Sequence, residues 1–273
     1  MLSTADGRGS AGPPELSILI PVFNERATIR QVIEKVRRID FRADREIIVV
    51  DDGSTDGTGD ILASEPEQED VRIVCHARNG GKGSAIQTAL RHARGRFVVI
   101  QDADLELNPE DIIPLFEVVR SGRALVCYGS RFMGDCRRFI RLPTYWANRI
   151  LTLVCNLLNG QHLTDMNTCY KMMRADVARQ IRLFSRGFAM EPEITTKLGR
   201  MGVRIVERPI SYQPRSKAEG KKIRSVDLLR YLVAMVRYRF FRQAAAPVPI
   251  PERNRANMKS TSGASRIYAM QTA

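Results

Sequence analysis

The first half of the chain alternates short apolar runs with stretches whose apolar residues recur at helical spacing. The uninterrupted apolar runs predict strands at 16–20, 46–50, 71–75 and 97–100. The helical stretches between and after them predict helices at 26–38, 57–63, 83–93 and 109–121. Strands without polar alternation suit a parallel sheet that is buried on both faces. The order of elements therefore predicts an α/β fold, with a mostly parallel sheet flanked by helices.

The pattern becomes less regular in the second half. A strand at 124–128 is followed by a basic stretch at 131–149, a helix ending at Leu158 and a strand at 169–173. A helix at 192–201 and a strand at 203–207 come next. No change in composition marks a second core, so we expect one domain at 16–241. Residues 1–15 and 242–273 are small, polar and proline-containing, and we expect a disordered leader and a disordered tail.

The end of this domain, 225–241, predicts an amphipathic C-terminal helix. Leu228, Leu232, Met235 and Val236 share a stripe at 3.6 residues per turn, and the arginines fall largely outside it. Such a stripe can lie on the cytoplasmic face of a membrane, helped by basic residues near anionic headgroups. It can equally pack on the protein's own sheet. The sequence leaves both interpretations open.

Composition and charge limit the classes of partner. The 273 residues include 43 Lys and Arg against 30 Asp and Glu, which gives a formal charge of +13 and favours anionic partners. No zinc-finger spacing, aromatic RNA-binding signature or basic heptad pattern supports nucleic acid. The five cysteines are scattered, and residues 1–15 lack the apolar segment of a signal peptide. No apolar run is long enough to span a bilayer. We expect a cytoplasmic protein, with peripheral membrane contact as an option.

Polar clusters follow three of the predicted strands directly. They are Pro21-Val22-Phe23-Asn24-Glu25, then Asp51-Asp52-Gly53-Ser54-Thr55-Asp56, then Gln101-Asp102-Ala103-Asp104-Leu105-Glu106. Each cluster alone would be an ordinary solvated turn. Together they would converge at the carboxyl edge of a parallel sheet, where ligands bind in such folds. So much like charge in one place indicates a cation or another ligand that offsets the repulsion.

Two of these features suit a phosphorylated ligand and a metal. Asp102, Asp104 and Glu106 recur at every second position, and Mg²⁺ commonly takes one or two carboxylates with substrate phosphates completing its shell. The segment Asn79-Gly80-Gly81-Lys82-Gly83-Ser84 lies between a strand and a helix. Its glycines allow a close approach to an anion at a helix N-terminus. It lacks the Walker spacing, and taken alone it could be a flexible turn.

The ordered set PVFNE, VVDDGSTDGT, NGGKGSAI, QDADLELNPEDI and GSRF resembles the family 2 inverting glycosyltransferases of the GT-A fold. The dolichyl-phosphate and polyprenyl-phosphate hexose synthases are the most similar group. TDMNTCYKMMR, FAMEPEIT and RPISYQPR also resemble that group. The similarity covers residues 16–241. It implies transfer of glucose or mannose from a nucleotide-sugar, such as UDP-glucose or GDP-mannose, to a polyprenyl phosphate.

The resemblance also implies roles for individual residues. Pro21, Phe23, Glu25 and Asp52 would hold the nucleotide base and ribose, with Lys82 near the same pocket. Asp102 would face the ribose or the sugar. Asp104 and Glu106 would hold Mg²⁺ or Mn²⁺ at the diphosphate, where a cation neutralises the leaving group. Arg131 of GSRF would meet the acceptor phosphate, for which a planar guanidinium is suited.

The chain departs from the family pattern at the acceptor side. Related synthases have a second Arg with a Ser four residues later, whereas here Asn148 and Thr152 occupy that register and Arg149 lies one place out. A hydroxyl acceptor on a glycan or small molecule therefore stays an alternative. It would need a carboxylate base, for which Asp165 and Glu191 are candidates. A non-catalytic nucleotide-sugar-binding module, or a protein that works with a membrane partner subunit, is the third interpretation.

Overall fold

The computed structural model describes residues 12–66, 68–134, 140, 142–185, 187, 189–214 and 226–241. Seven strands form one sheet in the order β3-β2-β1-β4-β6-β5-β7. Their bounds are β1 (Leu16–Val22), β2 (Arg45–Asp51), β3 (Val71–Cys75), β4 (Phe97–Ile100), β5 (Val126–Ser130), β6 (Lys171–Arg174) and β7 (Ile205–Pro209). Strand β6 is antiparallel to β4 and β5, and the other neighbours are parallel. The predicted mostly parallel sheet is confirmed.

Helices connect the strands as the sequence pattern predicted. They are α1 (Ile29–Arg38), α2 (Thr58–Ser64), α3 (Lys82–His92), the 3₁₀ turn η1 (Pro109–Asp111), α4 (Ile112–Arg120), α5 (Leu142–Asn159), α6 (Ala175–Gln180), α7 (Met190–Arg200), α8 (Val226–Val236) and the π-helical η4 (Arg237–Phe241). The sequence pattern did not predict α6. Helix α1 starts three residues later than predicted. The preceding backbone N–H groups of Glu25 and Arg26 donate to side chains of the next loop instead.

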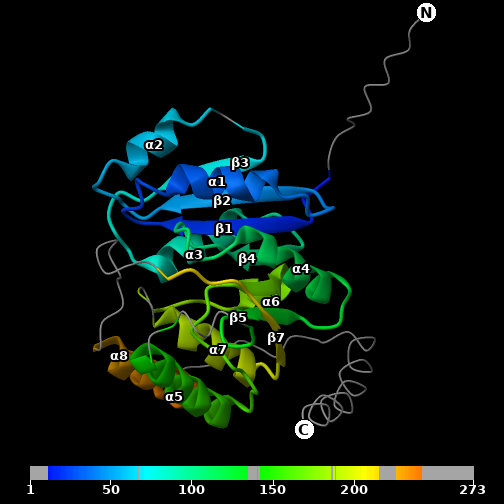
Figure 1. Cartoon of the computed structure of the whole chain (residues 1–273), viewed down its shortest axis with the longest axis vertical. Coiled ribbons are helices and arrows are strands. Elements are labelled where there is room, and N and C mark those ends of the chain that lie inside the picture. The colour runs from blue at the N-terminus through cyan, green and yellow to red at the C-terminus, as the bar shows by residue number, and fades with distance from the viewer. Residues whose placement is uncertain are drawn as a thin grey trace, which may run out of the picture.

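The packing follows the burial pattern of each element. Strands β1, β4 and β5 are buried along their whole length, as strands covered on both faces must be. Helix α3 packs on β1 and β2, and α4 packs on β4, β5 and β6. Helices α5, α7 and α8 pack on one another at the end of the molecule away from α1 and α2 (Figure 1).

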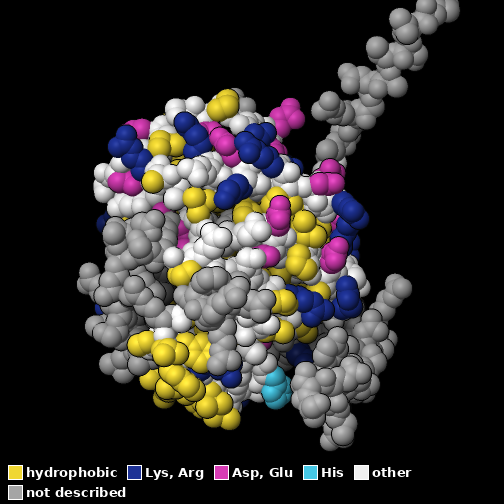
Figure 2. All heavy atoms as spheres, in the orientation of Figure 1, with side chains coloured by type: hydrophobic (Ala, Val, Ile, Leu, Met, Phe, Trp, Pro, Cys, Tyr) yellow, Lys and Arg dark blue, Asp and Glu magenta, His cyan; other side chains and the backbone are white. Residues whose placement is uncertain are grey.

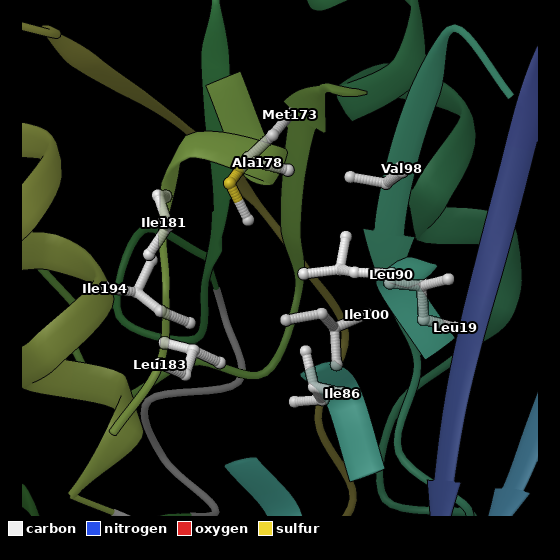
Figure 3. A pocket seen from close by; sticks show the side chains of 10 residues that line it. All are labelled: Leu19, Ile86, Leu90, Val98, Ile100, Met173, Ala178, Ile181, Leu183 and Ile194. Carbon is white, nitrogen blue, oxygen red and sulfur yellow. The ribbon is translucent and has the colours of Figure 1, made fainter. Parts of the chain in front are cut away.

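One apolar pocket lies between the sheet and helices α3, α6 and α7. Figure 3 shows its lining side chains, which are Leu19, Ile86, Leu90, Val98, Ile100, Met173, Ala178, Ile181, Leu183 and Ile194. None of them offers a hydrogen-bonding group to a polar ligand. The pocket is therefore part of the hydrophobic core, and substrate chemistry has to be sought at the strand ends.

Helix α8 and the π-helical η4 occupy 226–241, and the residues expected to form one apolar stripe there differ in burial. Met235 is fully buried and Leu232 packs against the core, whereas Val236 is 44% exposed. Helix α8 contacts α5 and α7. The side chains of Leu228 and Leu229, the leader up to residue 11 and the tail from 242 lie outside the described residues. Among the helices that the structure describes, none has the length and apolarity needed to cross a bilayer.

A buried carboxylate holds together the edge of the sheet where the parallel strands have their amino-terminal ends. The Glu46 side chain on β2 accepts hydrogen bonds from Ser17 Oγ at 2.6 Å, the backbone N of Arg94 at 2.6 Å and the backbone N of Gly95 at 3.2 Å. Arg94 Nε also donates to it at 3.0 Å. Burial alone would raise the pKa of Glu46, but these donors and the Arg94 charge lower it below its ordinary value.

We predict that Glu46→Gln lowers the free energy of unfolding at pH 7 by about 1–3 kcal/mol, the usual range for hydrogen bonds to a charged group. A lowered folded-state pKa stabilises the fold above the unfolded pKa of about 4.3 and loses this contribution as the pH falls through the folded value. The variant should therefore show a weaker acid dependence. Urea unfolding from pH 7 to pH 3 measures both effects. The exposed Glu34→Gln on α1 is the control, and an equal loss there would contradict the prediction.

Candidate active site

The loops after β1 and β2 are joined to each other by side-chain hydrogen bonds. The backbone N of Asn24 donates to Ser54 Oγ at 2.9 Å, and Asn24 Oδ1 accepts from the backbone N of Thr55 at 2.9 Å. The backbone N of Glu25 donates to Thr58 Oγ1 at 3.0 Å. Asn24 adopts φ 54°, a left-handed conformation that Asn tolerates better than most residues. The polar clusters that follow β1 and β2 thus form one hydrogen-bonded unit at this edge of the sheet.

Asp52 holds the glycine-rich segment in place. Its carboxylate is buried and accepts the backbone N–H of Gly80 at 3.0 Å and of Gly81 at 2.6 Å. His76 Nδ1 lies 2.7 Å from Asp52 Oδ1, and His76 Nε2 lies 2.9 Å from Thr88 Oγ1 on α3. Gly81 has φ 88° and precedes α3, so a side chain there would be strained. The carboxylate therefore determines where Lys82, the first residue of α3, emerges.

Lys82 begins a chain of alternating charges that runs into the protein. Its Nζ lies 2.7 Å from Asp102 Oδ1 and 3.4 Å from Glu191 Oε1. The other oxygen of Glu191 pairs with Lys171 Nζ, which also donates to the backbone carbonyls of Met166 and Thr168. Lys171 is fully buried on β6. All three donors of its ammonium group are thereby satisfied, as a buried cation requires.

The pKa values reflect this pairing. Burial by itself would lower the pKa of Lys82, but the charges of Asp102 and Glu191 raise it well above its ordinary value. Burial would raise the pKa of Asp102, yet the Lys82 ammonium beside it holds that pKa below the ordinary value. Both groups are therefore charged at neutral pH, and Lys82 keeps a positive charge at the mouth of the site.

Asp104 and Glu106 follow Asp102 in the loop after β4. Asp104 Oδ1 accepts the backbone N–H of Glu106 at 3.1 Å, and Glu106 Oε2 accepts from the Tyr212 hydroxyl at 3.3 Å. Burial and the Glu106 charge raise the pKa of Tyr212 to about 12, so its hydroxyl stays a donor. Within the part of the chain that the structure describes, no three carboxylate, imidazole or thiol groups come together as a ready cation site. Mg²⁺ commonly takes only one or two carboxylates, and phosphate oxygens supply remaining ligands of its shell.

Arg131 lies across from this loop, at the end of β5. Its Nε and Nη2 bind the two oxygens of Asp165 at 2.7 and 2.9 Å, and Nη2 also donates to the carbonyl of Asn167 at 3.0 Å. The Arg131 guanidinium lies 5.3 Å from the centre of the Tyr212 ring. Asp165 is fully buried. Tyr212 therefore connects the carboxylate loop, through Glu106, to the guanidinium of Arg131.

The loop that carries Asp165 is held from two directions. Glu207 on β7 accepts from the backbone N of Thr164 at 2.7 Å and of Asp165 at 3.0 Å. From α5, Arg149 donates to the carbonyl of Thr164 at 3.4 Å, and Thr152 Oγ1 accepts from the backbone N of Met166 at 3.2 Å. Arg149 and Thr152, at the place where the sequence departs from the family pattern that it resembles, thus support this loop, and through it Arg131.

The structure brings most of the predicted residues to one edge of the sheet. Pro21 is buried in β1 and Phe23 and Glu25 are half-buried in the loop that follows. Thr28 Oγ1 donates to Glu25 Oε2 at 3.1 Å and to the carbonyl of Ala103 at 2.9 Å, which ties the first cluster to the third. A second basic segment of the sequence, 215–224, lies outside the described residues.

Four residues of this site had no predicted role. Lys171, Glu207, His76 and Tyr212 act through contacts between segments that are far apart in the sequence. The one signal in the sequence was a charged residue inside an expected strand, which applies to Lys171 and Glu207. A charge in a buried strand requires a partner, but the pattern does not identify it.

The comparisons agree with this architecture. Residues 17–182 match the family model described as Glycosyl transferase family 2. The sheet, the strand-end loops and the match together define a glycosyltransferase, and the chain belongs to glycosyl transferase family 2.

Several curated relatives are similar over most of the domain. The chain is 31% identical over 206 residues to a low-salt glycan biosynthesis hexosyltransferase of Haloferax volcanii, covering 74% of this chain and 48% of the relative. It is 31% identical over 215 residues to an undecaprenyl-phosphate mannosyltransferase of Micrococcus luteus, covering 74% and 85%. It is 26% identical to a dolichol-phosphate mannosyltransferase of Mycosarcoma maydis, covering 86% and 84%. The chain thus spans about half of the first relative and most of the other two.

Solved structures share the fold. Glucosyl-3-phosphoglycerate synthase of Mycobacterium tuberculosis in complex with uridine-diphosphate has a TM-score of 0.62 at 19% identity, covering 84% of this chain and 82% of that one. The same enzyme with Mn²⁺, uridine-diphosphate and phosphoglyceric acid has a TM-score of 0.60 at 19% identity, covering 84% and 80%. The predicted GT-A architecture is confirmed.

We predict that Lys171→Met lowers the free energy of unfolding by about 3–5 kcal/mol, because Glu191 loses the closer and more deeply buried of its two counter-ions. Glu191→Gln should be destabilising as well, and the double variant should cost less than the sum, with a coupling of about 0.5–3 kcal/mol. Urea unfolding of the four proteins measures the coupling. Lys35→Met, at an exposed position of α1, is the control for removing a surface ammonium. Strict additivity would show that the pair does not interact.

Proposed function

We propose that the protein transfers a hexose from a nucleotide-sugar to a polyprenyl phosphate with inversion at the anomeric carbon. The observation that carries this proposal is that both candidate general bases are held in ion pairs. Asp165 binds the Arg131 guanidinium through both oxygens, and Glu191 lies between Lys171 and Lys82. A hydroxyl acceptor needs a base to take its proton, whereas a phosphate is already an anionic nucleophile.

Arg131 is the residue proposed to receive the acceptor phosphate. Asp165 and the carbonyl of Asn167 occupy its Nε and Nη2. Among the described residues none accepts a hydrogen bond from Nη1, so this edge of the guanidinium suits a phosphate oxygen. Asp165 is then a positioning residue that fixes the plane of the guanidinium. Its burial and the two backbone hydrogen bonds to Glu207 keep that plane constant.

The donor is proposed to bind along the loops after β1, β2 and β4. Pro21, Phe23, Glu25 and Asp52 line the nucleotide side, with Asp52 acting through the glycine-rich segment that it holds. Lys82 and Asp102 face the sugar and diphosphate. These residues suit UDP-glucose and GDP-mannose equally, because they supply charge and backbone groups for the ribose and the diphosphate, which both donors share.

Asp104 and Glu106 are proposed to hold Mg²⁺ or Mn²⁺. When bound, the cation neutralises the charge that develops on the diphosphate leaving group. The acceptor oxygen then forms a bond to the anomeric carbon as the bond to the diphosphate breaks on the opposite side, which inverts the configuration. Lys82 adds a fixed positive charge on the donor side. The M. tuberculosis enzyme of similar fold has been solved with Mn²⁺ and with Mg²⁺ alongside uridine-diphosphate, which supports this choice of cation.

The relatives support the acceptor class. An undecaprenyl-phosphate mannosyltransferase, a dodecaprenyl-phosphate galacturonate synthase and a dolichol-phosphate mannosyltransferase all carry a polyprenyl-phosphate acceptor in their names. Such acceptors reside in membranes, so the protein would work at a membrane surface facing the cytoplasm. A membrane partner subunit would be compatible with this location.

A transfer assay with radiolabelled donors tests the proposal. UDP-glucose and GDP-mannose are each offered with a polyprenyl phosphate, with a non-phosphorylated polyprenol and with a glycan acceptor. We expect transfer to the phosphate alone, and a β-linked product from an α-linked donor by NMR coupling constants. Transfer to the glycan in place of the phosphate would favour the hydroxyl alternative. Binding of a donor without transfer to any acceptor would favour a non-catalytic module.

We predict that Asp104→Asn lowers turnover by roughly two or more orders of magnitude, the scale of losing one electrostatic stabiliser of the transition state. Removal of divalent cations with EDTA should abolish transfer, and Mg²⁺ or Mn²⁺ should restore it. Asp60→Asn on α2 is the control for a neutralised carboxylate outside the proposed donor and acceptor contacts. Full activity of the wild-type protein in excess EDTA would overturn the assignment of a metal to Asp104 and Glu106.

A further inference from the structure

Helix α5 presents a continuous apolar stripe to solvent. Leu142 is 72% exposed, Trp146 61%, Ile150 57%, Leu153 58% and Leu157 78%. These positions follow one another at intervals of four, four, three and four residues, so they share one face of the helix. An 18-residue helix is about 27 Å long, and the stripe extends along nearly all of it. We name these five residues the α5 stripe.

The opposite side of α5 already serves the fold. Leu151, Thr152, Cys155 and Asn159 are buried against the rest of the protein. The α5 stripe is therefore not needed to attach the helix to the core. Monomeric proteins seldom expose so many large apolar side chains in a row unless the surface binds something.

Helix α8 and η4 extend the apolar surface. Val233 is 56% exposed, Phe240 63% and Phe241 79%. Helices α5 and α8 are in contact, and Figure 2 shows hydrophobic side chains gathered at the lower left, where α5 and α8 lie in Figure 1. The surface thus comprises two adjacent helices, and it differs from the α8 stripe expected from the sequence because Met235 is turned inward.

One end of the α5 stripe lies next to the proposed acceptor site. Trp146 stacks edge-on against Tyr145 at 5.4 Å between ring centres, and Tyr145 meets Phe132 at 5.2 Å. The Arg131 guanidinium lies 5.8 Å from the centre of the Phe132 ring. Aromatic contacts therefore connect the residue that would hold the acceptor phosphate to the start of the exposed apolar surface.

The charged side chains of α5, α8 and η4 that the structure describes are all basic. Helix α5 contains no acidic residue, and its single charged side chain is Arg149. Arg230 and Arg237, on α8 and η4, are exposed. The chain as a whole carries a formal charge of +13. Exposed apolar side chains with exposed arginines on the adjacent helix are complementary to an anionic lipid surface, which offers acyl chains below a negative layer of headgroups.

We propose that the α5 stripe, together with the exposed residues of α8 and η4, docks on an anionic lipid bilayer and thereby brings Arg131 to the headgroup level. This inference rests on the proposed function, since a polyprenyl phosphate has its phosphate at that level and its chain in the membrane. A second copy of the chain fits the surface less well, because two strongly basic molecules repel each other.

The first experiment is co-sedimentation of the full chain with vesicles of phosphatidylcholine containing about 30% phosphatidylglycerol, and with vesicles of phosphatidylcholine alone. We expect binding to the anionic vesicles that weakens as the salt concentration rises. Leu153→Glu/Leu157→Glu should bind at least roughly tenfold more weakly. The matched control is Gln31→Glu/Ala63→Glu, which makes the same charge change at exposed positions of α1 and α2 and should bind nearly as the wild type does.

Vesicle binding measures docking independently of catalysis. If the wild-type chain does not bind anionic vesicles, or if Leu153→Glu/Leu157→Glu binds as tightly as the control, the proposal is overturned. A wild-type dimer that this variant converts to a monomer, without vesicle binding, would assign the surface to a second copy. Should the variant not fold by circular dichroism, Val233→Glu/Phe240→Glu on α8 and η4 provides the second test with the same expectation.

A transfer assay separates this inference from the proposed function. Transfer to a short, water-soluble prenyl phosphate should be the same in Leu153→Glu/Leu157→Glu and in the wild type, because neither leucine contacts the proposed site. Transfer to a long polyprenyl phosphate embedded in vesicles should fall at least roughly tenfold in the variant. Wild-type binding to vesicles without transfer to either acceptor would refute the proposed function and leave the docking surface intact. Equal transfer to the embedded acceptor by both proteins would refute the docking.

Discussion

The need to balance negative charge at the carboxyl edge of the sheet constrains this site more than any other interaction. Asp102, Asp104 and Glu106 lie in one loop, and Glu191 approaches it from α7. Lys82 and Lys171 alternate with Asp102 and Glu191 in a row, and Arg131 binds Asp165 on the acceptor side. Buried charges of this kind persist only when they are paired and hydrogen-bonded. The surrounding elements must therefore hold these side chains in place.

The pairing also couples the two halves of the site. Lys171 donates to the carbonyls of Met166 and Thr168 while it binds Glu191, and the same loop carries Asp165. Tyr212 lies against Arg131 and donates to Glu106. Direct contacts of side chains and backbone therefore connect the proposed donor side to the loop of the proposed acceptor side. This arrangement suits a reaction in which the nucleophile has to attack the anomeric carbon in line with the leaving group.

If it docks on a membrane as proposed, the exposed surface of α5 fixes how the site is oriented relative to that membrane. In a chain whose proposed substrates are a soluble nucleotide-sugar and a lipid-linked phosphate, one side of the molecule has to face water and the other the membrane. The α5 stripe lies on the proposed acceptor side, next to the aromatic residues beside Arg131. The loops after β1 and β2, which are proposed to bind the donor, are tied to each other near α1 and α2 at the other end of the molecule (Figure 1).

The sequence by itself determined the sheet, its main helices and the clusters that meet at the strand ends. Uninterrupted apolar runs and helical spacing are local properties, and parallel strands bring their carboxyl ends to one edge whatever the details. It could not determine the partners of Lys171, Glu207 and Tyr212, because those partners lie in other segments of the chain. The partner of Tyr212, for example, is the distant Glu106. It also predicted an amphipathic helix at 225–241 and left open whether its apolar stripe faces a membrane or the core. Only the packing of α8 against α5 and α7 decided that Met235 points inward and that the α5 stripe stays exposed. Periodicity shows that a helix has an apolar face, but neighbouring elements decide which face is buried, because burial depends on contacts between distant parts of the chain.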